Sequence, residues 1–123
     1  MKNLNLITDK IIGCSIEVHK QLGPGLLESI YEEALCCEFE FHNILYQRQF
    51  FMPVIYKGKK LSDFRLDLIV ENEVIVELKA VSRIESVFEA QLLSYLKMAD
   101  KKIGLLINFN VPVLKNGIKR MIL

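Results

Sequence analysis

The chain has 123 residues, of which 51% are hydrophobic and 25% are charged, and its formal net charge is +1. This length fits one domain, residues 1–123, with a core of its own, and the hydrophobic content excludes a disordered chain. A net charge near zero neither favours nor excludes nucleic acid as a partner, because binding depends on local patches.

The first part of the chain is predicted to form two helices and a strand. Hydrophobic residues recur at helical spacing over residues 6–22 and 26–42, and the Gly-Pro-Gly segment at 23–25 separates them. The stripe expected to be buried on the second helix consists of Leu27, Ile30, Ala34, Cys37 and Phe41. Residues 45–56 are predicted as a strand, in which Pro53 indicates an edge position or a bulge because proline cannot donate to a sheet ladder.

A turn at residues 57–60 precedes the most informative part of the sequence. Residues 64–70 and 74–81 are β-rich runs separated by a short polar break, a pattern that predicts a β-hairpin. The residues nearest the break are continuously hydrophobic, which indicates a sheet covered on both faces. With the loop centred on Asn72, residues equally distant from it lie opposite each other on the two strands.

Charged residues interrupt both strands of this hairpin. Asp67 lies opposite Glu77 in that register, and Glu77 and Lys79 project to the same side because side chains alternate along a strand. Charges inside a hydrophobic sheet are costly unless they pair or bind a metal. Two carboxylates and a lysine suit Mg²⁺-assisted phosphodiester cleavage. The alternative is a surface ion-pair cluster, and Arg65, on the strand face of Asp67, is either an ion-pair partner or a phosphate ligand.

The last part of the chain adds one helix and two strands. Residues 86–89 have the pattern of a capping box, which predicts a helix that begins near residue 87 and ends near residue 99. A hydrophobic strand is expected over 103–109, a turn at 116–117, and a last strand over 118–122. The order α-α-β-β-β-α-β-β predicts an α/β fold, with a mixed central β-sheet flanked by helices.

Other candidate residues lie on the predicted helices. Gln91 and Tyr95 are four residues apart on a stripe expected to face the core, where a glutamine needs a partner; the alternative is a position at the core rim. Glu28 lies in the first turn of the second helix, where an acidic residue is also favoured by the helix dipole. His19 is expected to cap the end of the first helix, and His42 to be a surface residue without neighbours of functional type.

Taken together, these residues resemble a known nuclease motif. The spacing Asp67-x9-Glu77-x-Lys79 resembles that of the PD-(D/E)xK nuclease superfamily. The pair Gln91-x3-Tyr95 looks like the additional motif of a branch related to the nuclease domains of recombination helicases.

A narrower resemblance covers residues 25–31, GLLESIY, which look like the signature that names the GxxExxY protein family. The resemblance extends over nearly the whole chain. It implies a restriction-endonuclease-like core of order α-β-β-β-α-β, which the predicted order contains from the second helix onward. Leu66 stands where the motif nominally has proline, as in divergent members of the superfamily.

The resemblance also implies a ligand set for Mg²⁺ or Mn²⁺. Asp67 and Glu77 would bind the ion, the Leu78 carbonyl would be a further ligand, and Glu28 would bind directly or through water. The ion would activate the water that attacks the phosphodiester bond.

The remaining roles concern the substrate. Lys79 would position the attacking water and stabilise charge on the phosphate, and Gln91 would orient Lys79 or hold the phosphate. Tyr95 and Arg65 are candidates for contact with nucleic acid.

The expected function is therefore Mg²⁺-dependent hydrolysis of phosphodiester bonds, with DNA as the expected nucleic acid and RNA as an alternative. The rival hypothesis is a non-catalytic nucleic-acid-binding or assembly module that retains the nuclease fold. The high hydrophobic content suggests a homodimer through the first helix and the strand at 118–122. The three cysteines do not form a disulfide framework, and the absence of a membrane-span or signal-peptide pattern makes the cytoplasm the expected location.

Overall fold

The structure is a computed structural model that describes residues 3–123. Its elements follow the predicted order α-α-β-β-β-α-β-β, with one additional short 3-10 helix before the last strand. They are α1 (Leu4–Leu22), α2 (Glu28–Phe41), β1 (Tyr46–Tyr56), β2 (Lys59–Val70), β3 (Val74–Lys79), α3 (Ser86–Ala99), β4 (Ile103–Asn108), η1 (Leu114–Gly117) and β5 (Ile118–Ile122).

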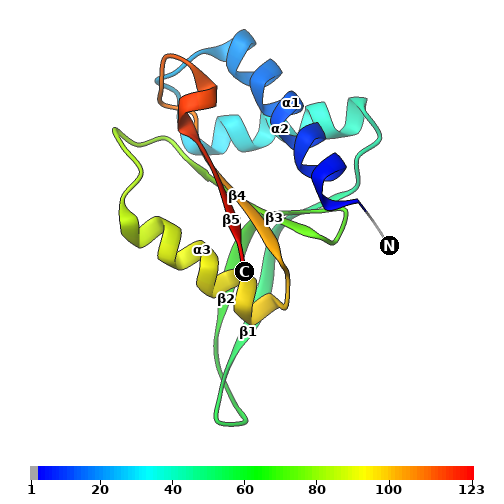
Figure 1. The fold of residues 1–123 in the computed structure, drawn as a ribbon, viewed down its shortest axis with the longest axis vertical. Coiled ribbons are helices and arrows are strands. Elements are labelled where there is room, and N and C mark those ends of the chain that lie inside the picture. The colour runs from blue at the N-terminus through cyan, green and yellow to red at the C-terminus, as the bar shows by residue number, and fades with distance from the viewer. Residues whose placement is uncertain (1–2) are drawn as a thin grey trace.

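The five strands form one mixed sheet in the order β1-β2-β3-β4-β5 (Figure 1). Strands β3 and β4 are parallel, with α3 as the connection between them, and all other neighbours are antiparallel. β1 lies at one edge, and its register shifts between Pro53 and Ile55. This confirms the interpretation of Pro53 as a residue of an edge strand with a bulge. The predicted α/β fold with a mixed central sheet is also confirmed.

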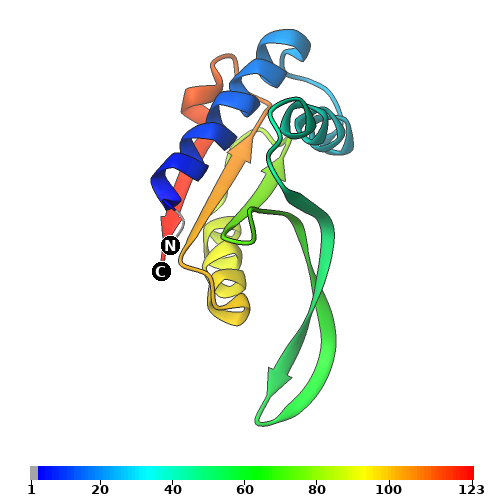
Figure 2. The same cartoon turned by 90° about the vertical axis from the view of Figure 1, so that its right-hand side faces the viewer.

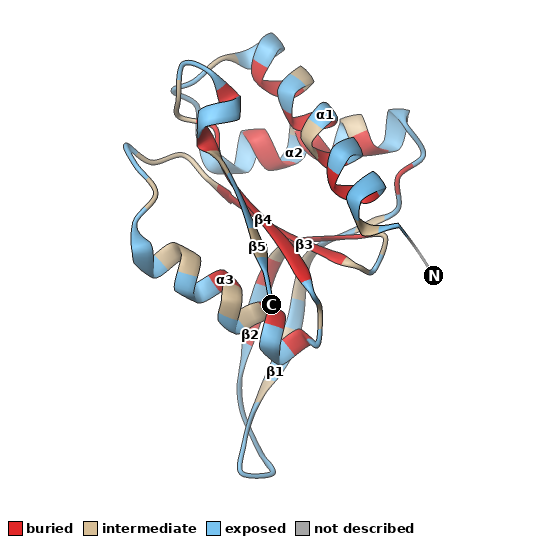
Figure 3. Cartoon of the chain, in the orientation of Figure 1, coloured by how far each residue is buried: buried red, intermediate tan, exposed pale blue. Residues whose placement is uncertain are grey.

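Helices cover both faces of the sheet, with α1 and α2 on one face and α3 on the other (Figure 2). Val76 and Leu78 of β3 belong to the core beneath α1 and α2, whereas Ile75 packs against α3. All six residues of β4 are buried (Figure 3). The continuously hydrophobic runs of the sequence are therefore the strands that lie between two helical layers. Within residues 3–123, no helix has the length and hydrophobicity that a membrane crossing requires.

The buried face of α2 differs from the predicted one. Of the predicted stripe, Leu27 and Phe41 are 72% and 75% exposed. The stripe that is buried consists of Tyr31, Glu32, Leu35, Cys36 and Phe39. Hydrophobicity alone does not predict this face, because it contains a glutamate. Glu32 can be buried there because two donors on β1 bind its carboxylate, as described below.

The predictions of how two helix ends are capped are also wrong. Glu85 is the N-cap of α3 and no side chain caps this end, so the capping box predicted at residues 86–89 does not form. His19 does not cap α1 with its ring, which is buried with Nε2 2.8 Å from the carbonyl oxygen of Val111. The backbone of Gly23, at φ 70°, ends α1 instead, and its N–H donates to the carbonyl of His19.

Candidate active site

The predicted hairpin register is confirmed, and it ends where the acidic residues begin. Val70 pairs with Val74, and two further pairs follow, the last between Leu68 and Val76. At the next position the carboxylates take the place of the regular ladder. The N–H of Asp67 donates to Oε2 of Glu77 at 2.8 Å. The N–H of Leu78 donates to Oδ2 of Asp67 at 2.9 Å. Each carboxylate thus binds the backbone of the partner strand.

Both strands of the β1–β2 hairpin change face at this same level. Leu66 packs against α3, but Leu68, two residues on, lies in the core beneath α1 and α2. Residues two apart on a regular strand share a face, so the backbone is irregular at Asp67. On β1, Gln49 has a φ of 53°, a conformation rare for residues other than glycine. We call this level, defined by Gln49 and Asp67, the kink; beyond it the hairpin continues as a long twisted arm (Figure 2).

Burial dominates the electrostatics of the acidic pair. Glu77 is only 5% exposed, and burial, followed by the charge of Asp67, raises its pKa to about 8. The N–H of Asp67 and the charge of Lys79 act in the opposite direction without cancelling that effect. Burial also raises the pKa of Asp67. The two carboxylates are thus poorly compensated by the protein, which fits a site for a divalent cation.

Lys79 lies beside this pair on the α3 face of the sheet. Its Nζ is 4.5 Å from the centroid of the Phe88 ring, in the first turn of α3. A cation above an aromatic face is attracted by the ring quadrupole. Phe88 therefore holds the ammonium group in position, a role expected of Gln91 from the sequence.

Gln91 and Tyr95 occupy different environments on α3. Gln91 is exposed, and within residues 3–123 its side chain has no hydrogen-bond partner. The expectation that it faces the core is wrong, because the buried stripe of α3 runs one position away through Leu92 and Leu96. Tyr95 is half-buried and stacks on Phe64, with 4.9 Å between ring centroids. Burial raises the pKa of Tyr95, and the charges of Glu77 and Asp67 add to this effect. Any role of Gln91 at the site stays a prediction.

A pocket of about 430 Å³ lies between α2 and the kink and brings three predicted residues together, namely Glu28, Arg65 and Asp67. Glu28 is exposed in the first turn of α2. Its pKa is raised by burial and by the charge of Asp67, and lowered by Lys79 and the backbone of Ala80. The side chain of Glu28 is thus close enough to Asp67 for their charges to interact.

The same pocket contains three residues that the sequence analysis missed. Glu32, 6% exposed, accepts hydrogen bonds from Arg48 Nε and Gln49 Nε2, each at 2.7 Å. Gln49 is the kink residue of β1, so this carboxylate ties α2 to the kink. The available signal was the spacing Glu28-x3-Glu32, since residues four apart share one helix face.

The ligand atoms of Glu28, Asp67 and Glu77 do not all lie within 4.8 Å of one another. Among residues 3–123, the group whose potential ligand atoms lie within 4.8 Å of one another is Cys14, Glu38 and His42, which is elsewhere in the fold. At the kink, Oδ1 of Asp67 and the second oxygen of Glu77 remain available for a cation. Glu28 would have to rotate to complete the set. The donor chemistry fits Mg²⁺ or Mn²⁺, because all three groups offer hard oxygen ligands.

The comparisons with known proteins agree with this geometry at the level of the family. The sequence profile of the PD-(D/E)XK nuclease superfamily matches residues 5–121. The chain therefore belongs to the PD-(D/E)XK nuclease superfamily, whose nucleases typically use divalent metal ions. No curated protein and no solved structure matches the chain. The narrower resemblance to the GxxExxY family stays a prediction.

Proposed function

We propose that this chain is a metal-dependent nuclease that hydrolyses phosphodiester bonds in DNA. The observation that carries the proposal is the buried pair of Asp67 and Glu77, whose carboxylates replace the ladder between β2 and β3. A fold does not bury two poorly compensated carboxylates side by side without a stability penalty. A divalent cation would remove that penalty and supply the Lewis acid that the superfamily's chemistry requires.

The residues at the kink would have two roles, namely binding a metal ion and stabilising negative charge on the phosphate. Asp67, Glu77 and Glu28 would hold Mg²⁺ or Mn²⁺, with the Leu78 carbonyl as a further ligand. When bound, such an ion would act as a Lewis acid and would make water a stronger nucleophile toward the phosphodiester phosphorus. Lys79, fixed above Phe88, provides positive charge for the phosphate oxygens as negative charge develops there.

The pocket beside α2 provides the approach for the substrate backbone. Arg65 is exposed at its wall and is free to bind a phosphate, because the buried Glu32 is already paired with Arg48. Beyond the kink, the tip of the hairpin arm is basic, with Lys57 and Lys59 among its exposed residues. Such charges bind phosphates without reading sequence. We therefore expect contact with nucleic acid along the arm, without sequence specificity of its own.

The assembly that we propose is a homodimer. β5 is an edge strand of the sheet, and Ile122 near its end is 67% exposed. An exposed hydrophobic edge is a template for pairing with a second copy. Sedimentation at micromolar concentration should give a species of twice the chain mass, and a species of about 14 kDa alone would contradict this proposal.

Two substitutions test catalysis separately from metal binding. Lys79→Ala should keep the fold and Mn²⁺ binding, yet lower the cleavage rate by on the order of 10²-fold, the loss typical for one charge-stabilising group. Glu77→Ala should lose both metal and activity. Lys97→Ala, which removes an exposed lysine of α3, is the matched control and should cleave like wild type.

The assay uses the full chain with Mg²⁺ or Mn²⁺ and single- and double-stranded DNA and RNA. Cleavage of RNA in preference to DNA would correct the substrate but keep the chemistry. If wild type cleaves none of these better than Lys79→Ala, the enzyme proposal fails. The non-catalytic binding module would then be the better account.

A further inference from the structure

A second cluster of metal-ligating side chains lies between α1 and α2. Cys14 on α1, Glu38 on α2 and His42 at the end of α2 bring a thiol, a carboxylate and an imidazole together, with all three ligand atoms within 4.8 Å of one another. They line a pocket of about 510 Å³ that shares no residue with the pocket at the kink. We propose that these three residues bind a zinc-class transition-metal ion.

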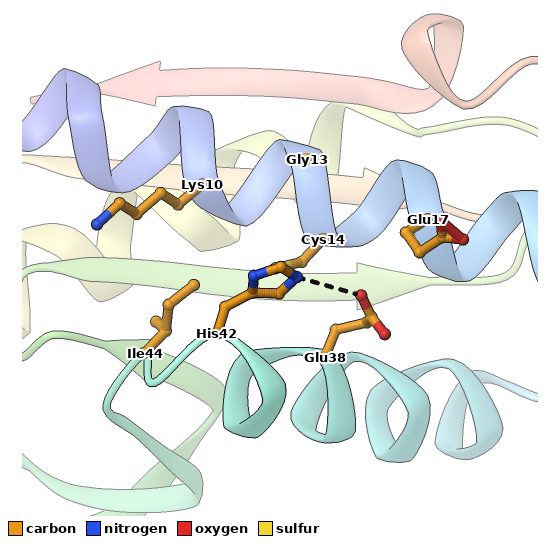
Figure 4. A pocket seen from close by; sticks show the side chains of 7 residues that line it. All are labelled: Lys10, Gly13, Cys14, Glu17, Glu38, His42 and Ile44. Atoms are coloured by element: carbon orange, nitrogen blue, oxygen red, sulfur yellow. Dashed lines mark ion pairs between the residues drawn. The ribbon is translucent and has the colours of Figure 1, made fainter.

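The elements place the three side chains without strain. Glu38 and His42 are four residues apart, so both project from one side of α2, and Nε2 of His42 is 3.7 Å from Oε1 of Glu38. Cys14 faces them from the buried stripe of α1. Figure 4 shows the side chains of Cys14 and Glu38 beside the His42 ring, with the contact between His42 and Glu38 marked by a dashed line. The sequence predicts His42 to be a surface residue without functional neighbours, because this arrangement depends on how two helices pack.

The degree of burial suits a bound ion. Cys14 is 5% exposed and the Glu38 side chain 17%, whereas the His42 side chain is 62% exposed. An ion would reach the site from the solvent side past His42 and meet the thiol at its base. At Gly13, directly before Cys14, an added Cβ would meet nothing within 4 Å, so the pocket is open at this part of its wall.

The ligand types select the ion. Cysteine sulfur and imidazole nitrogen are the ligands of Zn²⁺, whereas Mg²⁺ prefers oxygen. Three protein ligands leave a fourth tetrahedral position, which water can fill. On binding, the ion replaces the proton on Sγ of Cys14, which passes to solvent. Lys10 is the one cationic side chain of the wall, and it extends along α1 away from the cluster (Figure 4).

An ordinary explanation exists for each contact alone. A glutamate and a histidine one turn apart form a weak ion pair at many helix ends, and an isolated thiol is frequently buried. Neither explanation accounts for all three groups in one open pocket. A metal at this site would link α1 to the end of α2, which continues into β1 and the kink. It would therefore stabilise the fold rather than take part in cleavage.

Co²⁺ is a suitable test ion because its absorption spectrum depends on which atoms coordinate it. Added to the purified full chain in excess Mg²⁺, which occupies the oxygen site, Co²⁺ should give a thiolate-to-cobalt charge-transfer band at one equivalent. Cys14→Ser should abolish the band. Cys37→Ser, which removes an exposed thiol from the same helix that carries Glu38 and His42, is the matched control and should keep it.

A second measurement does not depend on replacing a buried residue. His42→Gln changes an exposed side chain and should lower the affinity for Zn²⁺ by at least about tenfold in competition with a chromophoric chelator, while Glu33→Gln leaves it unchanged. Absence of the cobalt band in wild type, or its persistence in Cys14→Ser, would overturn the proposal. Equal Zn²⁺ affinity of wild type and His42→Gln would do so as well. None of these results depends on nuclease activity.

Discussion

The pH dependence of stability tests the buried acidic pair in the absence of metal. Burial, followed by the charge of Asp67, raises the pKa of Glu77 from 4.5 to about 8 in the folded protein. In the unfolded chain this group ionises near the lower value, so between these two pH values the unfolded state has released a proton that the folded state retains. The free energy of unfolding therefore falls as pH rises through this window, and the group contributes nothing below it.

The size of the effect follows from the two pKa values. Each pH unit inside the window lowers the free energy of unfolding by up to about 1.4 kcal/mol, and the whole window amounts to at most about 5 kcal/mol. The loss belongs to the pair rather than to one residue, because Asp67 and Glu77 are adjacent and titrate together.

The substitution that isolates this effect is Glu77→Gln. Glutamine has nearly the same size, its amide oxygen can still accept from the N–H of Asp67, and it does not ionise. Urea unfolding followed by circular dichroism from pH 5 to 9, with a chelator present, should show wild type losing several kcal/mol by pH 8 and Glu77→Gln losing much less. Glu33→Gln, an exposed position on α2, should retain the wild-type slope.

Metal should reverse the loss in wild type alone. At pH 8, Mg²⁺ at 100 times its dissociation constant should raise the free energy of unfolding by about 2.7 kcal/mol, with no comparable gain in Glu77→Gln. Parallel stability curves for wild type and Glu77→Gln between pH 5 and 8 would refute the reasoning, because they would mean that Glu77 ionises freely in the folded protein.

Two further substitutions test how the pocket beside α2 is held together. Tyr31→Phe should lower the free energy of unfolding by about 1–2 kcal/mol, because the hydroxyl donates to Gly23 O at 2.5 Å and accepts from Leu26 N at 3.1 Å; unchanged urea stability would show that these two bonds are replaced by water. Glu32→Ala should cost about 2 kcal/mol and reduce cleavage, since the half-exposed Arg48 can turn to solvent but the tie between α2 and the kink is lost. Wild-type activity in Glu32→Ala would show that the kink needs no such support.

The hairpin could be predicted because two independent constraints agree on its register. Both strands are hydrophobic next to the loop, and a shift of one residue would turn every side chain to the opposite face. Asn72 therefore had to be central, and the approach of Asp67 to Glu77 followed from that alone. The mixed sheet was predictable for a related reason, since β3 and β4 have hydrophobic residues on both faces.

The environment of α2 could not be predicted in the same way. Its buried stripe includes Glu32, and no pattern of hydrophobicity favours a glutamate inside a core. The partners that make this burial tolerable, Arg48 and Gln49, lie on a strand whose pairing is itself irregular at Gln49. The prediction that Gln91 faces the core was wrong for the opposite reason. Its neighbours on α3 are hydrophobic, but its own side chain is exposed to solvent.

The cluster of Cys14, Glu38 and His42 could not be predicted from the sequence either, because it depends on tertiary packing. The spacing of Glu38 and His42 is visible in the sequence, but the third ligand comes from another helix. Which residue of α1 faces this part of α2 depends on how the two helices cross, and the hydrophobic stripes constrain that crossing only loosely. A three-ligand site built across two helices is therefore recognised only once the packing is known.

The irregular backbone at the kink explains why the acidic pair can be both buried and reactive. In a regular sheet the N–H groups of a strand bond to carbonyls of the neighbouring strands, and the side chains project away from the ladder. Here β2 pairs regularly with β3 only from Leu68 to Val70, and at Asp67 the carboxylates of Glu77 and Asp67 accept from the N–H groups of Asp67 and Leu78 instead. Each carboxylate then keeps one oxygen for a cation while its other oxygen is fixed by the backbone. A local departure from regular structure thus fixes the geometry of the ligands, as expected where function rather than stability determines the conformation.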